Sequence, residues 1–196
     1  MEAVQPADLG MTRPVHAGFE STKLVDALLA GDRSAAEEIV DETYALVYAS
    51  VFRLCGDSDL AADLTQETYA RAWRSLSQFQ RRCRFSTWLY RIAYTTFLNH
   101  VRKPQRLQPF DENVTEQMSD PGRGPDEEVE ERLDGGRLRR AVLDLPEELR
   151  YTVSARYWGE VPVREIARTE GITTVAIRKR LRRAMQHLRL ALEEAS

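Results

Sequence analysis

Residues 63–103 read DLTQETYARAWRSLSQFQRRCRFSTWLYRIAYTTFLNHVRK, and this stretch decides the fold class. Its apolar residues recur every three to four positions along 58–79 and again along 86–103, which is typical of amphipathic helices. Pro104 ends the second helix because proline cannot continue the helical hydrogen-bond ladder. Strand patterns are nearly absent elsewhere in the chain. The sequence therefore predicts an all-α protein.

The charged residues of the same stretch are all basic from residue 68 onward. No Asp or Glu occurs over 68–110, while arginines alternate with aromatic residues. Basic side chains bind phosphates, and exposed aromatic rings stack on unpaired bases. A small polar face formed by Asp63, Gln66 and Glu67 comes just before this block. We therefore expect a module that contacts a protein partner and single-stranded nucleic acid.

Two small helical domains are predicted, joined by a flexible acidic linker. Residues 104–134 contain four prolines, two glycines and many acids without helical periodicity, which is typical of an extended linker. The domains are expected at 22–103 and 135–196, and 1–21 is expected to be a disordered N-terminal arm. The expected helices are 23–30, 34–55, 58–79, 86–103, 138–143, 147–158, 163–170 and 174–192.

The helix at 86–103 is apolar nearly all round. One stripe can fill the core of its own bundle, and a second stripe is made of Tyr90, Tyr94, Phe97 and Val101. This second apolar stripe must also be covered, either by another helix or by a ligand.

Residues 163–184 read VREIARTEGITTVAIRKRLRRA and fit a helix-turn-helix. Ala167 is small enough for the helix crossing, Gly171 can adopt the positive φ of the turn, and Thr173 can cap the second helix. The second helix is basic, and its N-terminal half is the part that enters the major groove in this motif. A solvated basic helix is the alternative interpretation. The residues placed for bases are Thr174, Ala176, Lys179 and Arg180, and those placed for phosphates are Arg178, Arg182 and Arg183.

The chain resembles bacterial sigma factors, specifically the short extracytoplasmic-function (ECF) group. The resemblance covers 23–103 (sigma domain 2) and 138–192 (sigma domain 4). Its motifs are ADLTQETYARAW, FSTWLYRIA and LNHVRK in the first domain, and LPEELR, EIARTEGIT and IRKRLRRA in the second. The chain departs from the family pattern at Thr95, where Asn is common, and at Val175, where Gly is common. These departures affect which bases of the promoter we expect the protein to prefer, and they do not affect its assignment to this class of proteins.

The resemblance implies a non-enzymatic role in transcription initiation. Asp63, Gln66 and Glu67 would dock on the clamp helices of the largest subunit of core RNA polymerase. The helix after Thr173 would read the −35 element as duplex DNA. The promoter −10 element would be opened and read as single strands by Arg81, Arg82, Arg84, Trp88, Arg91, Asn99, Arg102 and Lys103. An anti-sigma factor is an expected partner, and the protein is expected in the cytoplasm without direct membrane insertion.

No catalytic group, metal or cofactor is expected. Cys55 and Cys83 form no C-x-x-C pair, the three histidines are scattered, and no phosphate-binding G-x-x-x-x-G-K-[ST] loop occurs. The main alternative is a helix-turn-helix transcriptional regulator that acts without being a polymerase subunit. A protein that occupies polymerase without initiating is a further alternative. Cys83 lies in the basic loop 80–84, which the resemblance assigns to the −10 element and which we call the −10 loop. Oxidation sensitivity and an incidental thiol both remain open for it.

Overall fold

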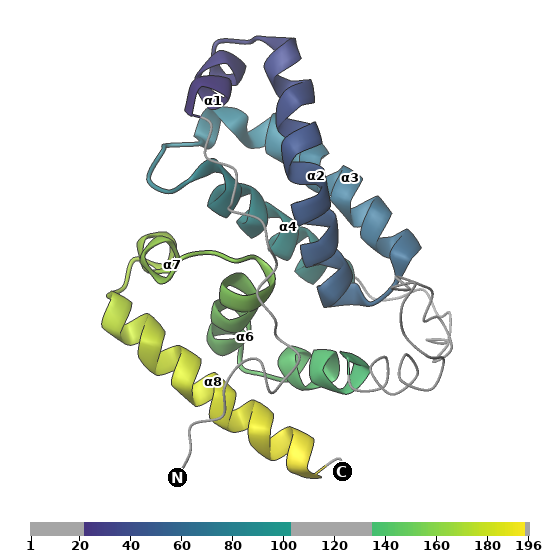
Figure 1. Ribbon diagram of the computed structural model, residues 1–196, viewed down its shortest axis with the longest axis vertical. Coiled ribbons are helices and arrows are strands. Elements are labelled where there is room, and N and C mark those ends of the chain that lie inside the picture. The colour runs from purple at the N-terminus through teal and green to yellow at the C-terminus, as the bar shows by residue number, and fades with distance from the viewer. Residues whose placement is uncertain (1–21, 103–134, 195–196) are drawn as a thin grey trace, which may run out of the picture.

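The computed structural model describes residues 22–102 and 135–194, and its regular elements there are all helical (Figure 1). The predicted N-terminal arm, the predicted linker and Lys103 lie outside the described residues. The N-terminal half contains α1 (Thr22–Leu29), α2 (Arg33–Cys55), α3 (Ser58–Ser75), η2 (Leu76–Gln78) and α4 (Phe85–Arg102). The C-terminal half contains a helix at 135–143, α6 (Glu147–Val153), η3 (Ser154–Trp158), α7 (Val163–Glu170) and α8 (Thr174–Glu194). The prediction of an all-α protein with two helical domains is confirmed.

Short polar residues start the long helices of the N-terminal half. The Asp32 carboxylate accepts a hydrogen bond from the Ser34 N–H at 2.9 Å, and the Asp57 carboxylate accepts one from the Leu60 N–H at 2.8 Å. Each carboxylate thereby pairs an amide that a helix start leaves without an intrahelical partner. Gly56 ends α2 with a φ of 76°, which glycine adopts without a Cβ penalty.

Two predicted helices end earlier as α-helices than the sequence indicated. The α-helix predicted to reach Phe79 stops at Ser75 and continues as the single 3₁₀ turn η2. The helix predicted over 147–158 stops at Val153, and η3 continues it as a π-helical turn. The Gly159 N–H donates to the Ser154 carbonyl at 2.9 Å, which is the i→i+5 bond of that turn.

The two halves pack against each other along one side of α4 (Figure 1). Tyr94 of α4 meets Tyr151 of α6 edge to face, with 5.1 Å between ring centroids. The Trp158 carbonyl of η3 accepts hydrogen bonds from Ser50 Oγ at 3.1 Å and from Arg53 at 3.3 Å, both on α2. We call this contact between α2, α4 and the 80–84 loop on one side, and α6, η3 and α7 on the other, the seam. The second apolar stripe of α4 therefore meets other helices of the same chain.

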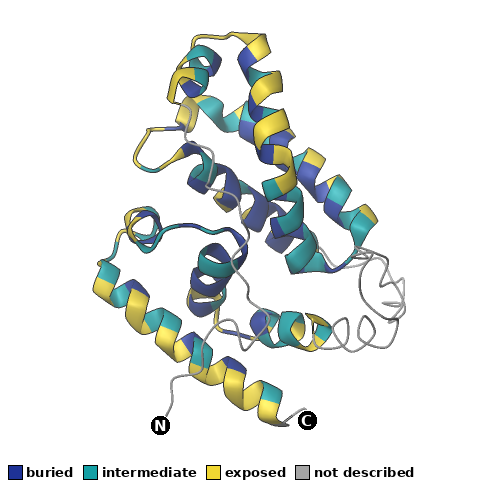
Figure 2. Cartoon of the chain, in the orientation of Figure 1, coloured by how far each residue is buried: buried dark blue, intermediate teal, exposed yellow. Residues whose placement is uncertain are grey.

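The buried residues form one core cluster that extends through both halves. Figure 2 shows buried segments (dark blue) on α2, α3 and α4 and again on α6, while α8 is exposed along one side. Tyr90, Tyr94 and Phe97 are each at most 4% exposed, so three members of the second stripe are buried. Val101, its fourth member, is 55% exposed. The seam accounts for the all-round apolar character of most of α4.

Candidate nucleic-acid interface

The helix-turn-helix at α7 and α8 is held by backbone geometry at the turn. Gly171 adopts a φ of 66°, and the Ile172 N–H donates back to the Ala167 carbonyl at 3.1 Å. The Thr173 hydroxyl accepts a hydrogen bond from the Ala176 N–H at 3.2 Å and so caps α8. Ile177 of α8 is fully buried. The crossing of the two helices is therefore fixed, and the first turns of α8 project outward.

The predicted −35 residues lie on or beside the outer face of α8. Thr173, Arg178, Lys179, Arg182 and Arg183 are exposed, whereas Thr174, Ala176 and Arg180 are half-buried.

Val175 lies among them and was not predicted as a site residue. Its 67% exposure is unusual for a large apolar side chain. A branched apolar group at this place can contact the methyl group of thymine in the major groove. The sequence did carry one signal that could have identified Val175 as a site residue: the family commonly has glycine at this position.

Arg180 differs from the other cations of α8 because two carboxylates hold it. Its guanidinium lies 3.1 Å from Glu148 of α6 and 3.4 Å from Glu170 of α7, and its side chain is only 21% exposed. The contacts tie three helices of the C-terminal half together. Arg180 would have to leave both carboxylates before it could bind a base.

The predicted −10 loop joins η2 to α4. Arg81 has a φ of 56°, which reverses the chain, and its guanidinium pairs with Asp26 of α1. Arg82 and Arg84 are exposed. Trp88 is half-buried and packs against Phe79 and Phe85, with 5.2 Å and 5.3 Å between ring centroids.

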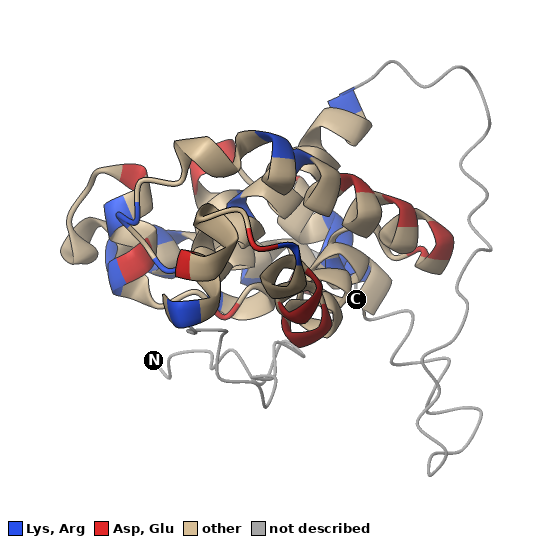
Figure 3. Cartoon of the chain, turned by 90° about the horizontal axis from the view of Figure 1, so that it is seen from above, with Lys and Arg blue, Asp and Glu red and all other residues tan. Residues whose placement is uncertain are grey.

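Trp88 lies near the start of α4, and the other predicted −10 residues of this helix, Arg91, Asn99 and Arg102, are all exposed. Arg91 and Arg102 are nevertheless engaged by acceptors of the C-terminal half. Figure 3 shows basic (blue) and acidic (red) residues next to one another in several parts of the molecule, as such pairing requires.

The predicted polymerase-docking face lies on α3. Asp63 and Gln66 are exposed, and Glu67 is half-buried. The Glu67 carboxylate forms an i,i+4 ion pair with the Arg71 guanidinium one turn later, at 2.6 Å. This ion pair holds the carboxylate in place on the helix surface.

Cys83 of the −10 loop is half-buried, and burial raises the pKa of its thiol, with the nearby Glu165 carboxylate acting in the same direction. A raised pKa lowers the thiolate fraction, which is the reactive form. Across the described ranges, 22–102 and 135–194, no cluster of three or more His, Cys, Asp or Glu residues could hold a metal ion. Nor does any described helix have the length and apolar character needed to cross a membrane.

Comparison with known protein families gives two matches. The model for Sigma-70 region 2 matches residues 39–107, and the model for Sigma-70, region 4 matches residues 135–188. Among relatives, the chain is 27% identical over 180 residues to the ECF RNA polymerase sigma factor SigW of Bacillus subtilis, covering 88% of this chain and 96% of SigW. It is 28% identical over 183 residues to the RNA polymerase sigma-H factor of Pseudomonas aeruginosa, covering 89% and 94%.

Solved structures give the same fold. CnrH in complex with the cytosolic domain of CnrY aligns with a TM-score of 0.62 and 19% identity, covering 89% of this chain and 97% of CnrH. The sigma factor RpoE from Bartonella quintana, in complex with the anti-sigma factor NepR, aligns with a TM-score of 0.55 and 20% identity, covering 80% and 98%.

Proposed function

This chain belongs to the sigma-70 family of RNA polymerase sigma factors, in its extracytoplasmic-function group, and we propose how its surfaces divide the work of that function. As a sigma factor it binds core polymerase and directs promoter-specific transcription initiation, and it is not an enzyme. Residues 22–103 would dock on polymerase and recognise the −10 element. Residues 135–196 would recognise the −35 element.

The docking surface is the polar face of α3 around Asp63, Gln66 and Glu67, and its target is the clamp helices of the largest polymerase subunit. Two of these side chains are exposed, and Glu67 is fixed by its ion pair with Arg71. Fixed polar groups lose less conformational entropy on binding than mobile ones, which favours recognition by a rigid surface.

The −10 surface is the 80–84 loop together with α4. Its cations would bind the phosphates of the melted strand, and the partly exposed Trp88 ring would stack at the edge of the open duplex. Capture of unpaired bases would offset the free energy of melting, so that no ATP is needed.

The −35 surface is the exposed face of α8, and this face is the observation that carries the proposal. Arg178, Lys179, Arg182 and Arg183 all project from a helix whose N-terminal turn is presented by a fixed helix-turn-helix. Lys179 and Thr174 would contact base edges, and the other cations would bind phosphates. Val175 would add a thymine-methyl contact.

An anti-sigma factor is a proposed partner, supported by the complex of RpoE with NepR. A cytoplasmic location is proposed because core polymerase and the promoter are there.

Reconstituted transcription tests the proposal. The purified protein is mixed with bacterial core RNA polymerase and genomic DNA fragments, and run-off transcripts are sequenced. We expect defined start sites that share two upstream motifs and that disappear when the protein is omitted. Promoter-selective DNA binding that does not depend on core polymerase would favour the independent helix-turn-helix regulator instead.

A matched pair of variants tests the −35 surface. Lys179→Ala and Arg189→Ala each remove one exposed cation from α8, but the second lies about 15 Å further along the helix at about 1.5 Å per residue. We expect Lys179→Ala to reduce promoter-specific transcription and Arg189→Ala to leave it nearly unchanged. Equal losses would show that α8 contributes only general positive charge.

A further inference from the structure

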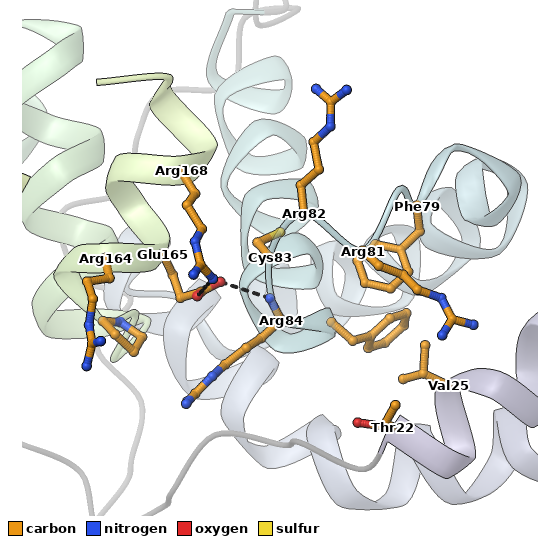
Figure 4. Close-up of a pocket in the computed structure, with 12 residues that line it drawn as sticks. Thr22, Val25, Phe79, Arg81, Arg82, Cys83, Arg84, Arg164, Glu165 and Arg168 are labelled. Carbon is orange, nitrogen blue, oxygen red and sulfur yellow. Dashed lines mark hydrogen bonds and ion pairs between the residues drawn. The ribbon is translucent and has the colours of Figure 1, made fainter. Parts of the chain in front are cut away.

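A pocket lies where α1, the −10 loop and α7 meet (Figure 4). Its volume is about 560 Å³, which is within the range of about 300–1,000 Å³ that small-molecule sites usually have. Protein interiors are close-packed and contain few voids of this size. The roles proposed above for the −10 loop and for the C-terminal half leave this pocket without an occupant.

The lining of the pocket is strongly basic. Among the described residues it contains five arginines and a single carboxylate, that of Glu165, so its formal charge is +4. The whole chain, by contrast, carries a net charge of −3. Charges of one sign along a concave surface concentrate the electric field and attract ions of the opposite sign. The arginines are Arg81, Arg82, Arg84, Arg164 and Arg168.

Glu165 neutralises at most one of these arginines. Its side chain is only 8% exposed, its Oε1 pairs with Arg168 at 2.8 Å, and its Oε2 accepts the Arg84 backbone N–H at 2.9 Å. One oxygen is therefore used by a main-chain amide and not by a guanidinium. Arg81 is engaged separately, because its guanidinium pairs with Asp26 of α1. The carboxylate holds α7 and the −10 loop in place around the pocket and leaves an excess of positive charge there.

The excess positive charge gathers at one end of the pocket. Figure 4 shows Arg84 and Arg164 extending on the same side of Glu165, whereas Arg82 points away from it. Arg164 is exposed and forms no ion pair or hydrogen bond with another residue of the described ranges. A guanidinium presents its N–H donors as a planar fork that can bind a phosphate through two hydrogen bonds. We call the part formed by Arg84, Arg164 and Arg168 the arginine end, and its chemistry suits phosphate groups.

The opposite side of the pocket is apolar. Val25 and Phe79 lie there, away from Arg164 (Figure 4). Phe79 packs edge to face on Phe85, with 5.5 Å between ring centroids and 88° between ring planes. A flat ring packs favourably on such an aromatic pair. The Thr22 hydroxyl lines the same side and can exchange hydrogen bonds with the polar edge of that ring.

We propose that this pocket binds a nucleoside polyphosphate, with the phosphates at the arginine end and the base against the apolar side. Inorganic phosphate would leave the apolar side empty, and an uncharged ring would leave the guanidinium groups without an anion. Only a ligand with both parts uses the whole lining. The inference goes beyond the proposed function and does not depend on it, because a nucleotide can bind whether or not the protein directs initiation.

Calorimetric titration of the full-length protein tests the proposal, with ATP, GTP, CTP and UTP as probes. The buffer contains EDTA and salt at about 0.15 M, so that charges more than about 8 Å apart are largely screened. We expect at least one triphosphate to bind at one saturable site with a Kd below about 1 mM, the upper end of the usual range for metabolites. Tripolyphosphate lacks the base, the free nucleoside lacks the phosphates, and the monophosphate has the single phosphate per base of a DNA strand. Each of these three should bind at least about tenfold more weakly.

A matched pair of variants locates the site. Arg164→Ala and Arg140→Ala each remove one exposed arginine and change the net charge equally, but only Arg164 lines the pocket. Arg164→Ala should weaken binding of the triphosphate by about 10- to 150-fold, as expected for lost hydrogen bonds to a charged group. Arg164→Lys keeps the charge but loses the fork, so its affinity should lie between those of the wild type and Arg164→Ala. Arg140→Ala should bind like the wild type, and thermal unfolding checks that every variant is folded.

Three results would overturn the proposal. The first is the absence of saturable binding of any triphosphate below about 1 mM. The second is an equal loss in Arg164→Ala and Arg140→Ala, which would assign the binding to positive charge in general. The third is a monophosphate or tripolyphosphate that binds as tightly as the triphosphate. A chain that binds the triphosphate as expected but directs no specific transcript would refute the proposed function and leave this site in place.

Discussion

Gly159 gives a direct measure of how tightly the seam is packed. A Cβ at this position would lie 2.3 Å from two carbons of the Tyr90 ring, whereas carbon atoms pack at about 3.5–4.0 Å. Tyr90 is only 4% exposed, so its ring has little room to retreat. Gly159 has a φ of −93° and a ψ of −1°, a negative-φ conformation that is open to alanine as well as to glycine. Overpacking costs about 1–3 kcal/mol, and here the cost is present only while the seam is packed.

We therefore expect Gly159→Ala to raise the population with a separated seam by about 5- to 140-fold, since about 1.4 kcal/mol corresponds to a factor of ten. The Arg84 amide reports this population because its hydrogen bond to Glu165 crosses the seam. Its native-state hydrogen-exchange rate, measured by NMR, should rise by the same factor.

Gly136→Ala is the matched control. It makes the same chemical change in the helix at 135–143, where an added Cβ meets nothing within 4 Å. Its Arg84 exchange rate should equal that of the wild type. A folded Gly159→Ala protein with an unchanged Arg84 exchange rate, or an equal rise in both variants, would refute the reasoning.

Three other perturbations address the turn, the reading helix and the core. Gly171→Ala should lower the free energy of unfolding in urea by about 1–2 kcal/mol, because a φ of 66° penalises a Cβ although the space around it is empty. Val175→Ala should weaken binding to a −35 element that contains the contacted thymine, and replacing that thymine with uracil should abolish the difference between the two proteins. Burial raises the pKa of Tyr69 and of Tyr94 to about 12, so both phenols stay neutral in the folded protein at pH values where the unfolded chain ionises, above about 10. The contribution of this pKa difference to stability should be constant below about pH 10 and decrease between about pH 10 and 12; a thermal midpoint that stays level across that range would contradict the assignment.

Local signals predicted most of the helix boundaries. Thr173 caps the helix that the sequence assigned to it, and Gly171 takes the positive φ expected at the turn. These features depend on hydrogen bonds between residues that are close in sequence. The ends at Ser75 and Val153 were not predicted, because helical periodicity alone does not distinguish an α-helix from a final 3₁₀ or π turn.

The candidate site was only partly accessible from the sequence. Patterns of charge indicated the basic face of α8 and the polar face of α3 around Glu67. The same reasoning treated Arg180 like its neighbours, because a list of cations does not reveal which one lies between two carboxylates. Val175 and Glu170 were missed for the same reason: their exposure and contacts depend on the packing of neighbouring helices.

The sequence by itself determined the helical class, the helix-turn-helix and the family, because apolar periodicity, capping residues and motif spacing act within a few turns of chain. It also indicated that α4 has a second apolar stripe in need of a partner. Only the tertiary structure decided that this partner is the other half of the chain. The contact from Arg91 to Thr169 spans 78 positions, and its existence depends on the relative orientation of two helical units, which no local hydrogen bond or periodicity specifies.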